Sequence, residues 1–485
     1  MSPRRRSGPR LISDSDGFRV LSMGPWQPRN DTVGLFCYSY LMSKVITRFA
    51  PSPTGKLHIG SYRTAIFSYL YAKHEGGQFV LRIEDTDRER SKKEYEDNIL
   101  ESLEWLGLSY DTFVRQSENV GRHKEVLEKM IADGHAYISK EEAKDGSGVI
   151  KEIIRFKNPN IDVAFDDLIR GHVSMNTTDL GDFVLAKNIN EPLFHLAVVV
   201  DDFDAGITHV IRGEDHTSNT PRQILIQRAI GAPTPIYAHL PLVLGEDKQK
   251  LSKRKGALPV TDYRDMGYLP EAILNASAMI GWNPGTPQEL FTKDELTVAF
   301  DLAKVQKGGA VLGVEKLLWY NREHMKKLSD KVFAEKAKEW FPEDLKAREN
   351  FSEIFPRLMP MLRDRLATFG ELKSMHDDGE LVYLFDAPSI NPEQLCFKTQ
   401  SRSDAKVNLE NILLALGAVP EDAFTKSKTE ETIMALIGEV SRGPFLHPLR
   451  YALSGRDRSP DPFTLLSILG KDASTARIQA VIALL

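Results

Sequence analysis

The chain has 485 residues, of which 41% are hydrophobic and 27% are charged, and its net charge is −5. These values predict a soluble globular protein of several domains and exclude an overall basic field for nucleic acid, so any such surface must be local. The two cysteines, Cys37 and Cys396, lie far apart, and neither a disulfide framework nor a zinc site is expected. No apolar run reaches the ~18 residues that a membrane span needs.

Residues 1–41 differ from the rest of the chain. They are rich in arginine, proline, serine and glycine and show little periodicity. A signal peptide would need a longer apolar region than 33–42, and an organelle transit peptide would carry fewer acidic residues. We expect a disordered or spuriously translated leader, with the working protein beginning near Met42.

The first clear element is a short apolar strand at 45–50, followed by the turn "APSPTG" and a helix that begins near His58. A helix N-terminus presents unpaired N–H groups and suits a phosphate. His58 would add a donor side chain there, and Gly60 would allow close approach. The alternative is an ordinary strand-to-helix turn with a histidine on the surface.

Alternating strands and helices continue after this unit and predict a parallel α/β sheet. We expect strands at 78–84, 193–202 and 208–216, and short β pieces within 136–193 that form an inserted β-rich segment. From about Leu269 onward the chain is expected to be helical. The fold class is therefore a Rossmann-type parallel-sheet domain with an inserted α+β subdomain, followed by an all-α C-terminal region.

A second rare stretch is "KQKLSKRKG" at 248–256, which places five cations within eight residues. Taken alone, such a run is most simply a solvated surface. The functional interpretation is a basic loop that clamps polyphosphate, in which Lys250 and Lys253 neutralise charge as a phosphoryl bond breaks.

Together, these stretches resemble a known family. "HIG" at a helix start and "KLSKR" about two hundred residues later are similar to the HIGH and KMSKS motifs of class I aminoacyl-tRNA synthetases. "RFAPSPTGKLHIG", "LRIEDTDRER", "FHLAVVVDD", "THVIRGEDH" and "KLSKRKG" resemble the glutamyl/glutaminyl branch in its bacterial form. The resemblance runs from Val45 to the C-terminus, and the five motifs occur in the family's order.

The resemblance implies an ATP-dependent glutamate–tRNA ligase. Glutamate would attack the α-phosphate of ATP, and the glutamyl group would then pass to the 3′-terminal ribose of tRNA-Glu. Mg²⁺ would arrive with ATP, and no zinc is expected. The residues that the resemblance assigns to catalysis are His58, Gly60, Lys250 and Lys253, and those that it adds for ATP binding are Pro53, Gly55 and Ser252.

The resemblance also implies a pocket for glutamate, which needs a cation for the side-chain carboxylate and an anion for the ammonium group. The implied pocket residues are Arg48, Ala50, Ser52, Glu84, Phe194 and Arg212. An arginine in an apolar strand needs an anion, and an internal ion pair of Arg212 with Glu214 or Asp215 is the alternative to a substrate. At Phe194 the family usually has tyrosine, and this chain lacks the hydroxyl group that would contact the substrate.

By resemblance, the catalytic domain occupies 43–135 and 194–245, and the acceptor-stem subdomain occupies 136–193. The KLSKR loop and a stem-contact domain follow at 246–325, and the anticodon-binding domain occupies 326–485. We expect a cytoplasmic monomer, and the sequence leaves open whether tRNA-Gln is charged as well as tRNA-Glu. The alternatives are a glutaminyl enzyme, a relative that charges a modified base of tRNA instead of the 3′ end, and an inactive tRNA-binding paralogue.

Overall fold

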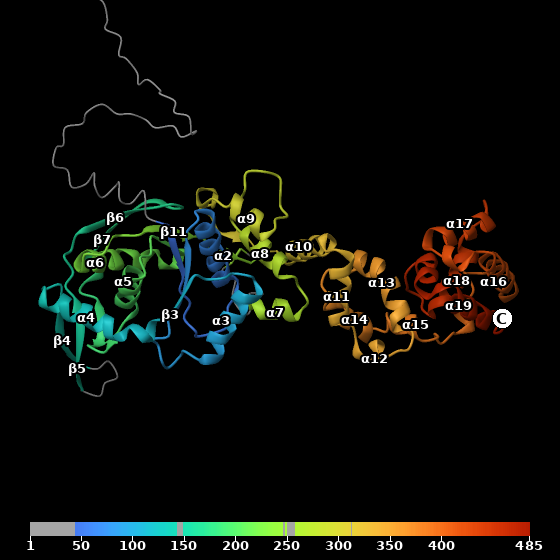
Figure 1. Cartoon of the computed structure of the whole chain (residues 1–485), viewed down its shortest axis with the longest axis horizontal. Helices are drawn as coiled ribbons and strands as arrows, with labels where there is room; N and C mark the ends of the chain where they lie inside the picture. The colour runs from blue at the N-terminus through green and yellow to red at the C-terminus, as the bar shows by residue number, and fades with distance from the viewer. Residues whose placement is uncertain (1–43, 143–148, 246–247, 250–257, 312) are drawn as a thin grey trace, which may run out of the picture. The chain divides into compact units, whose positions relative to one another are not determined.

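A central sheet carries the N-terminal part of the fold. The computed structural model describes residues 44–142, 149–245, 248–249, 258–311 and 313–485. Among these residues, seven strands form one sheet in the order β3-β2-β1-β10-β11-β6-β7 (Figure 1). Its strands are β1 (Ile46–Phe49), β2 (Gln78–Ile83), β3 (Thr112–Arg115), β6 (Asp162–Asp167), β7 (Gly171–Asn176), β10 (His209–Gly213) and β11 (Ile236–Leu240). All neighbours pair in parallel except β6 and β7.

Both faces of this sheet are buried, as the alternation of side chains shows. On β2, Phe79 and Leu81 belong to one hydrophobic core, whereas Val80 between them belongs to another. On β10, Ile211 belongs to the first of these cores and Val210 belongs to the second. Parallel strands with both faces covered read as continuous apolar runs, which is why β1, β2 and β10 are visible in the sequence.

Helices and short 3₁₀ turns connect and cover these strands. The helices of this part are α2 (Ile59–His74), α3 (Lys93–Trp105), α4 (Val120–Ala132), α5 (Phe194–Asp204), α6 (Thr220–Ile230), α7 (Val260–Asp265), α8 (Pro270–Ala278), α9 (Lys293–Ala299) and α10 (Val314–Lys327). The 3₁₀ turns are η1 (Gln116–Asn119), η2 (Thr178–Leu180), η3 (Glu214–Asn219) and η5 (Leu302–Lys304). The predicted parallel α/β class is confirmed, but the strand expected at 193–202 is wrong because this run forms α5. A short buried apolar run has no periodicity that separates a strand from a helix.

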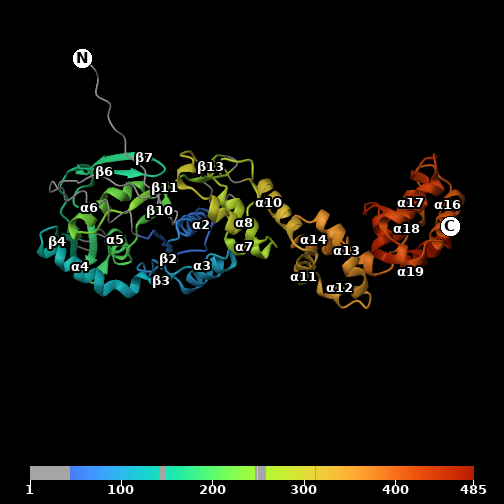
Figure 2. The same ribbon diagram turned by 45° about the horizontal axis from the view of Figure 1, so that its top comes forward.

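The inserted stretch at 136–193 contributes to two different sheets. Four of its strands form an antiparallel sheet of the described residues, namely β4 (Ala136–Glu142), β5 (Ile150–Phe156), β8 (Val184–Asn188) and β9 (Glu191–Pro192). The hairpin of β6 and β7 instead lies beside β11 and extends the central sheet (Figure 2). The predicted β pieces are therefore present, but the β6–β7 hairpin is continuous with the central sheet. A further parallel pair joins β12 (Val243–Leu244) to β13 (Ala310–Val311).

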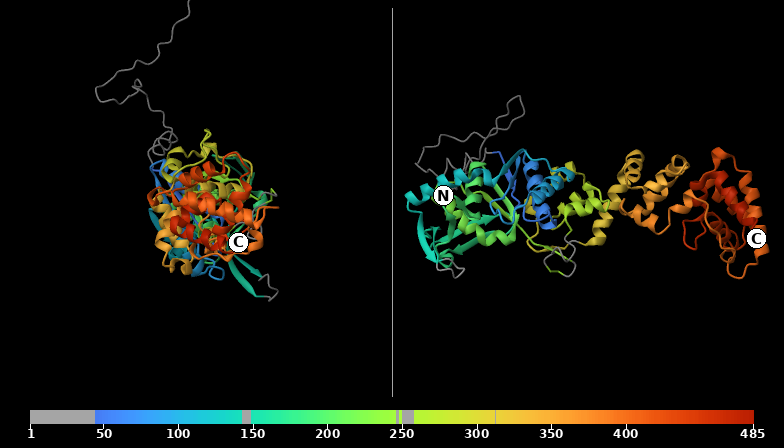
Figure 3. Two further views of the ribbon diagram at one scale, coloured as in Figure 1. Left: turned by 90° about the vertical axis from the view of Figure 1, so that its right-hand side faces the viewer. Right: turned by 90° about the horizontal axis from the view of Figure 1, so that it is seen from below.

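The C-terminal part is helical, as predicted, and its helices share a separate hydrophobic core. Its helices are α11 (Asp330–Trp340), α12 (Glu343–Lys346), α13 (Phe351–Arg365), α14 (Glu371–Asp377), α15 (Val382–Phe385), α16 (Arg402–Gly417), α17 (Lys426–Ile437), α18 (Gly443–Ser454) and α19 (Pro462–Ile482), with 3₁₀ turns η6 (Pro392–Gln394) and η7 (Glu421–Ala423). Helices α16 to α19 pack side by side, as Figure 3 shows. No helix among the described residues combines the length and apolarity that crossing a membrane requires.

The last helix, α19, is interrupted at Gly470. This residue has φ 78° and ψ 176°, a backbone conformation that only glycine adopts without strain. A Cβ at this position would also overlap the guanidinium of Arg357. That guanidinium donates from Nη1 to the carbonyl of Leu469 at 3.4 Å, so it binds at the interruption.

Replacing Gly470 by alanine should destabilise the helical part by about 1–3 kcal/mol, because the new side chain meets both an unfavourable φ and Arg357. Urea unfolding of the chain, followed by hydrogen exchange of amides in α16–α19, measures this effect. The matched control is Gly417→Ala near the end of α16, where an added Cβ meets nothing within 4 Å. The control should be neutral or stabilising by up to about 1 kcal/mol. Equal effects of the two substitutions would contradict the explanation.

Candidate active site

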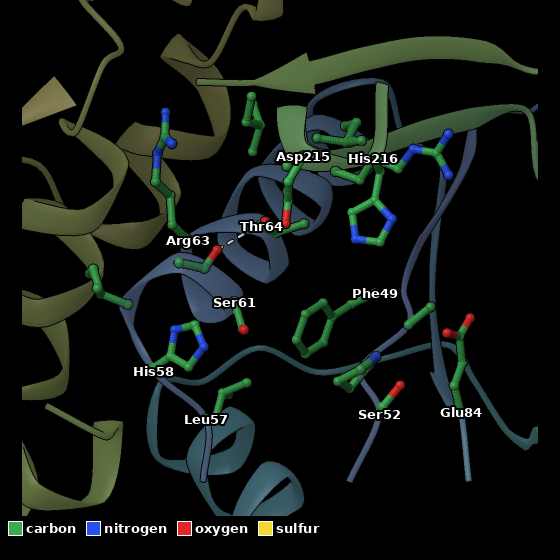
Figure 4. Close-up of a pocket in the computed structure, with 18 of the residues that line it drawn as sticks. Phe49, Ser52, Leu57, His58, Ser61, Arg63, Thr64, Glu84, Asp215 and His216 are labelled. Carbon is green, nitrogen blue, oxygen red and sulfur yellow. Dashed lines mark hydrogen bonds between the residues drawn. The ribbon is translucent and has the colours of Figure 1, made fainter. Parts of the chain in front are cut away.

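A cavity of about 560 Å³ opens at the carboxyl ends of β1, β2 and β10. In this sheet, β2 and β3 lie on one side of β1, and β10 and β11 lie on the other, so the strand order reverses at β1. Such a reversal leaves a crevice beyond the strand ends, where open α/β sheets bind their ligands. Figure 4 shows His58 and Ser61 on one side of the cavity, and Glu84, Ser52 and His216 on the other.

His58 marks one end of the cavity, at the N-terminus of α2. Its extended backbone makes it the N-cap, and its carbonyl accepts hydrogen bonds from the amides of Ser61 at 2.9 Å and Tyr62 at 3.0 Å. Gly60 is exposed beside it, and a Cβ there would lie 3.4 Å from the imidazole. The turn therefore brings backbone N–H groups, an imidazole and an open glycine to one place, which suits an anionic phosphate group.

The floor of the cavity contains a buried network of charges. Asp202 on α5 accepts from Arg48 Nε at 3.3 Å and from Arg82 Nη1 at 2.6 Å. Arg82 Nη2 donates to Glu84 at 3.1 Å, and Arg82 Nε lies 3.9 Å from Asp201. Burial alone would raise the pKa of Asp202, but Arg48 and Arg82 together hold it below its ordinary value. Arg48 is therefore already paired with a carboxylate of the protein.

Glu84 lies at the end of β2 and is buried against the same network. Burial raises the pKa of its carboxyl group, although Arg82 opposes this effect. The single guanidinium bond from Arg82 leaves Glu84 with acceptor capacity at the cavity. A ligand ammonium group would satisfy this capacity and relieve the cost of burying the charge.

Arg212 differs from Arg48 in one decisive way. It is 6% exposed, and no carboxylate of the described residues forms an ion pair with it. Its Nε donates to His239 Nε2 at 3.1 Å and its Nη2 donates to Thr220 Oγ1 at 2.7 Å. Burial lowers the pKa of Arg212 to about 10, so the group remains a cation at neutral pH. The alternative ion pair with Glu214 or Asp215 is wrong. Glu214 pairs with Arg170 instead, and among the described residues no ion pair joins Arg212 to Asp215.

Most residues that the sequence singled out line this one cavity. They are Arg48, Ala50, Ser52, Gly55, His58, Gly60, Glu84, Phe194 and Arg212. Pro53 does not line it: this residue is buried behind the turn, where its carbonyl accepts from the amide of Lys92 at 3.0 Å. Lys250, Ser252 and Lys253 lie outside the described residues. Phe194 stands at the first turn of α5 with its ring 5.9 Å from that of His216.

Several polar residues of the site were not found from the sequence. Arg82 and Asp202 belong to the network under the cavity, and Asp167 and His239 lie behind Arg212. Asp167 ends a half-exposed strand and gave no signal. A signal was present for Arg82, Asp202 and His239, because each is a charged or polar residue within a largely buried apolar segment. Such a residue needs a partner, but the sequence does not say which one.

Known proteins support the same interpretation. The chain matches the family model described as tRNA synthetases class I (E and Q), catalytic domain, over residues 44–145 and 138–319, and an anticodon binding domain over 332–482. The fold and the site thus define a class I tRNA synthetase of the E and Q group. A glutamate–tRNA ligase of Aquifex aeolicus is 40% identical over 91% of this chain and 99% of its own length. The glutamate–tRNA ligase 1 of Alkalilimnicola ehrlichii is 37% identical over 91% of this chain and 98% of its own length.

A solved structure gives the same result at the level of the fold. The glutamate tRNA ligase of Elizabethkingia meningosepticum, solved in complex with its amino acid, is 30% identical with a TM-score of 0.80. The match covers 91% of this chain and 99% of that one. The chain belongs to the glutamate–tRNA ligase family, and it is an aminoacyl-tRNA ligase whose C-terminal helices form an anticodon-binding domain.

Proposed function

We propose that this protein activates L-glutamate with ATP and transfers the glutamyl group to the 3′-terminal ribose of tRNA-Glu. The α-carboxylate oxygen of glutamate attacks the α-phosphorus of ATP, and pyrophosphate leaves. The ribose hydroxyl then attacks the acyl carbon, and AMP leaves. Alignment and charge stabilisation supply most of the catalysis in such a reaction.

The observation that carries the proposal is the pairing of charges in the cavity. Arg212 is a buried cation without a carboxylate partner among the described residues, and Glu84 is a buried anion with spare acceptor capacity. Glutamate carries the two complementary groups, a side-chain carboxylate and an ammonium. We therefore assign the carboxylate to Arg212 and the ammonium to Glu84. Arg48 already has Asp202 as its partner and is less suited to read the substrate side chain.

ATP occupies the other end of the cavity in this proposal. His58 would hydrogen-bond the phosphates at the N-terminus of α2, and Gly55 and Gly60 would leave room for the nucleotide. Mg²⁺ would enter with the phosphates of ATP as part of the substrate. Phe194 would form an aromatic wall for the amino acid without the hydroxyl group of a tyrosine.

The basic stretch is proposed to act on the same phosphates. On its N-terminal side the chain passes along the cavity at Val243, and on its C-terminal side Pro259 forms an antiparallel bridge to His58. Both flanks of 250–257 are thus attached to the site. In this proposal, Lys250, Ser252 and Lys253 of the stretch bind the pyrophosphate as it leaves.

Charging assays with purified tRNA test the proposal. Glutamate should be attached to tRNA-Glu in a reaction that needs ATP and Mg²⁺, and glutamine should not. Attachment of glutamine to tRNA-Gln would instead favour the glutaminyl alternative. Binding of tRNA without any attachment, together with no pyrophosphate exchange, would indicate an inactive paralogue. The same assay with tRNA-Gln and glutamate determines whether both tRNAs are charged.

We propose that the enzyme acts as a monomer in the cytoplasm, where translation consumes its product. Gel filtration with light scattering measures the first property, and cell fractionation measures the second.

A further inference from the structure

A buried chain of polar groups runs from the β6–β7 hairpin to Arg212 across three neighbouring strands. Asp167 at the end of β6 accepts from His239 on β11, at 2.6 Å from Nδ1 and 3.0 Å from the amide nitrogen. The other carboxylate oxygen accepts from the amides of Ile169 at 2.9 Å and Arg170 at 2.8 Å. His239 in turn accepts from Arg212 on β10. The Asp167 and His239 side chains are both 0% exposed.

The charges along this series of buried polar groups determine the protonation state of the His239 imidazole. Burial alone would raise the pKa of Asp167, but His239 and two backbone amides lower it, so the carboxylate stays ionised. Burial and the neighbouring Arg212 cation lower the pKa of His239, against the opposing effect of Asp167, so the ring is neutral at pH 7. A neutral imidazole with its proton on Nδ1 presents Nε2 as an acceptor. That acceptor meets the Nε–H of Arg212.

We infer that Asp167 and His239 are positioning residues that hold Arg212 in the orientation in which it reads the substrate side chain. The inference rests on the proposed function, because it takes Arg212 as the reader. Two nitrogens of the guanidinium are held, one by His239 and one by Thr220, so rotation of the group is restrained. Asp167 belongs to the inserted stretch, so a segment outside the two catalytic halves takes part in the selection of the amino acid.

Asp167→Asn tests the hydrogen bond between Asp167 and His239. The amide side chain of this variant can accept with only one oxygen, whereas the carboxylate accepts four N–H groups with two oxygens. An amide nitrogen facing Nδ1 favours the other tautomer of His239, whose Nε2–H would oppose the Nε–H of Arg212. The apparent KM for glutamate should rise about 10- to 100-fold, with a similar fall in the preference for glutamate over glutamine. The KM for ATP should stay unchanged.

Two further comparisons separate positioning from a general loss of structure. Asp166→Asn is the matched control, because Asp166 is the adjacent residue and pairs with an exposed histidine, His172, at 2.8 Å. It should change neither KM. Substitutions of His239 test its hydrogen bond with Arg212. His239→Gln keeps an acceptor near the position of Nε2, whereas His239→Leu removes it. The glutamine variant should retain most of the discrimination ratio that the leucine variant loses.

The outcomes distinguish this inference from the function on which it rests. All variants are measured as the full chain by pyrophosphate exchange with tRNA-Glu present, together with thermal melting. If Arg212→Gln lowers the discrimination ratio but Asp167→Asn and His239→Leu leave it unchanged, the inference is overturned and the proposed function stands. If Asp167→Asn lowers the use of both amino acids in equal proportion, its role is only structural. If Arg212→Gln itself leaves the ratio unchanged, Arg212 does not bind the substrate side chain, and the assignment on which this inference rests is wrong.

Discussion

Arg212→Gln should lower the use of glutamate by tens- to thousands-fold, while any residual use of glutamine falls much less. Glutamate and glutamine are nearly the same shape, so only charge separates them. With glutamine bound, the buried Arg212 would face a neutral amide, at a cost of about 2–5 kcal/mol. Removing the cation removes that penalty together with the attraction to glutamate. The quantity to measure is the ratio of kcat/KM for the two amino acids in pyrophosphate exchange with tRNA-Glu present.

Arg48→Gln is the control, because it removes the other cation of the pocket. Arg48 lies 3.3 Å from Asp202, so its charge is already balanced by the protein. The ratio should change little in this variant, even if both rates fall. If instead Arg48→Gln abolishes the preference for glutamate and Arg212→Gln lowers the use of both amino acids equally, the substrate carboxylate is bound by Arg48 on β1. If neither substitution changes the ratio, the substrate carboxylate is bound elsewhere.

Asp202→Asn should destabilise the catalytic part by about 3–5 kcal/mol, the usual cost of removing one charge from a buried pair. The substitution leaves Arg48 without its anion and Arg82 with one carboxylate fewer. Urea unfolding followed by hydrogen exchange of the amides in β1 and β2 measures the change. The pKa of Asp202 is lowered in the folded state, so its contribution is present above the unfolded pKa of about 4 and is lost as pH falls further. The difference between wild type and variant should therefore shrink below pH ~4.

The same helix supplies the control for this substitution. Asp204, two residues further along α5, pairs with Arg122 at 2.9 Å, and both side chains are well exposed. Asp204→Asn should cost less than about 1 kcal/mol, because exposed ion pairs contribute little. A similar loss in the two variants would show that the carboxylate at position 202 is not held in a buried network.

The sequence predicted those parts of the fold that depend on local pattern. The strands at 45–50, 78–84 and 208–216 are visible because buried parallel strands are continuously apolar, and the helix after His58 is visible because a Pro/Gly turn precedes it. Helix α5 was mistaken for a strand because its apolar run is equally typical of both. Its Asp202, a charge within an apolar run, indicated that a partner was needed, but not that this partner is Arg48, 154 residues away.

The site was predicted as a set of residues, but its internal pairing was not. Motif resemblance named Arg48, Glu84 and Arg212 together, and all three line the cavity. Only the three-dimensional structure shows that Arg48 has a carboxylate partner, whereas Arg212 has His239 and Thr220. Pairings of this kind join residues on different strands and helices, and no local pattern encodes them.

The continuity of the β6–β7 hairpin with the central sheet limits how this enzyme can be reduced in size. A shortened catalytic fragment made by excising 136–193 as one block would turn β11 into an open edge, with unpaired groups that invite association with other chains. The same excision would remove the carboxylate from behind His239. A shortened enzyme must therefore keep 162–176. The antiparallel sheet cannot simply be removed either, because Ile154, Phe156 and Leu185 share a hydrophobic core with Val80 of the central sheet.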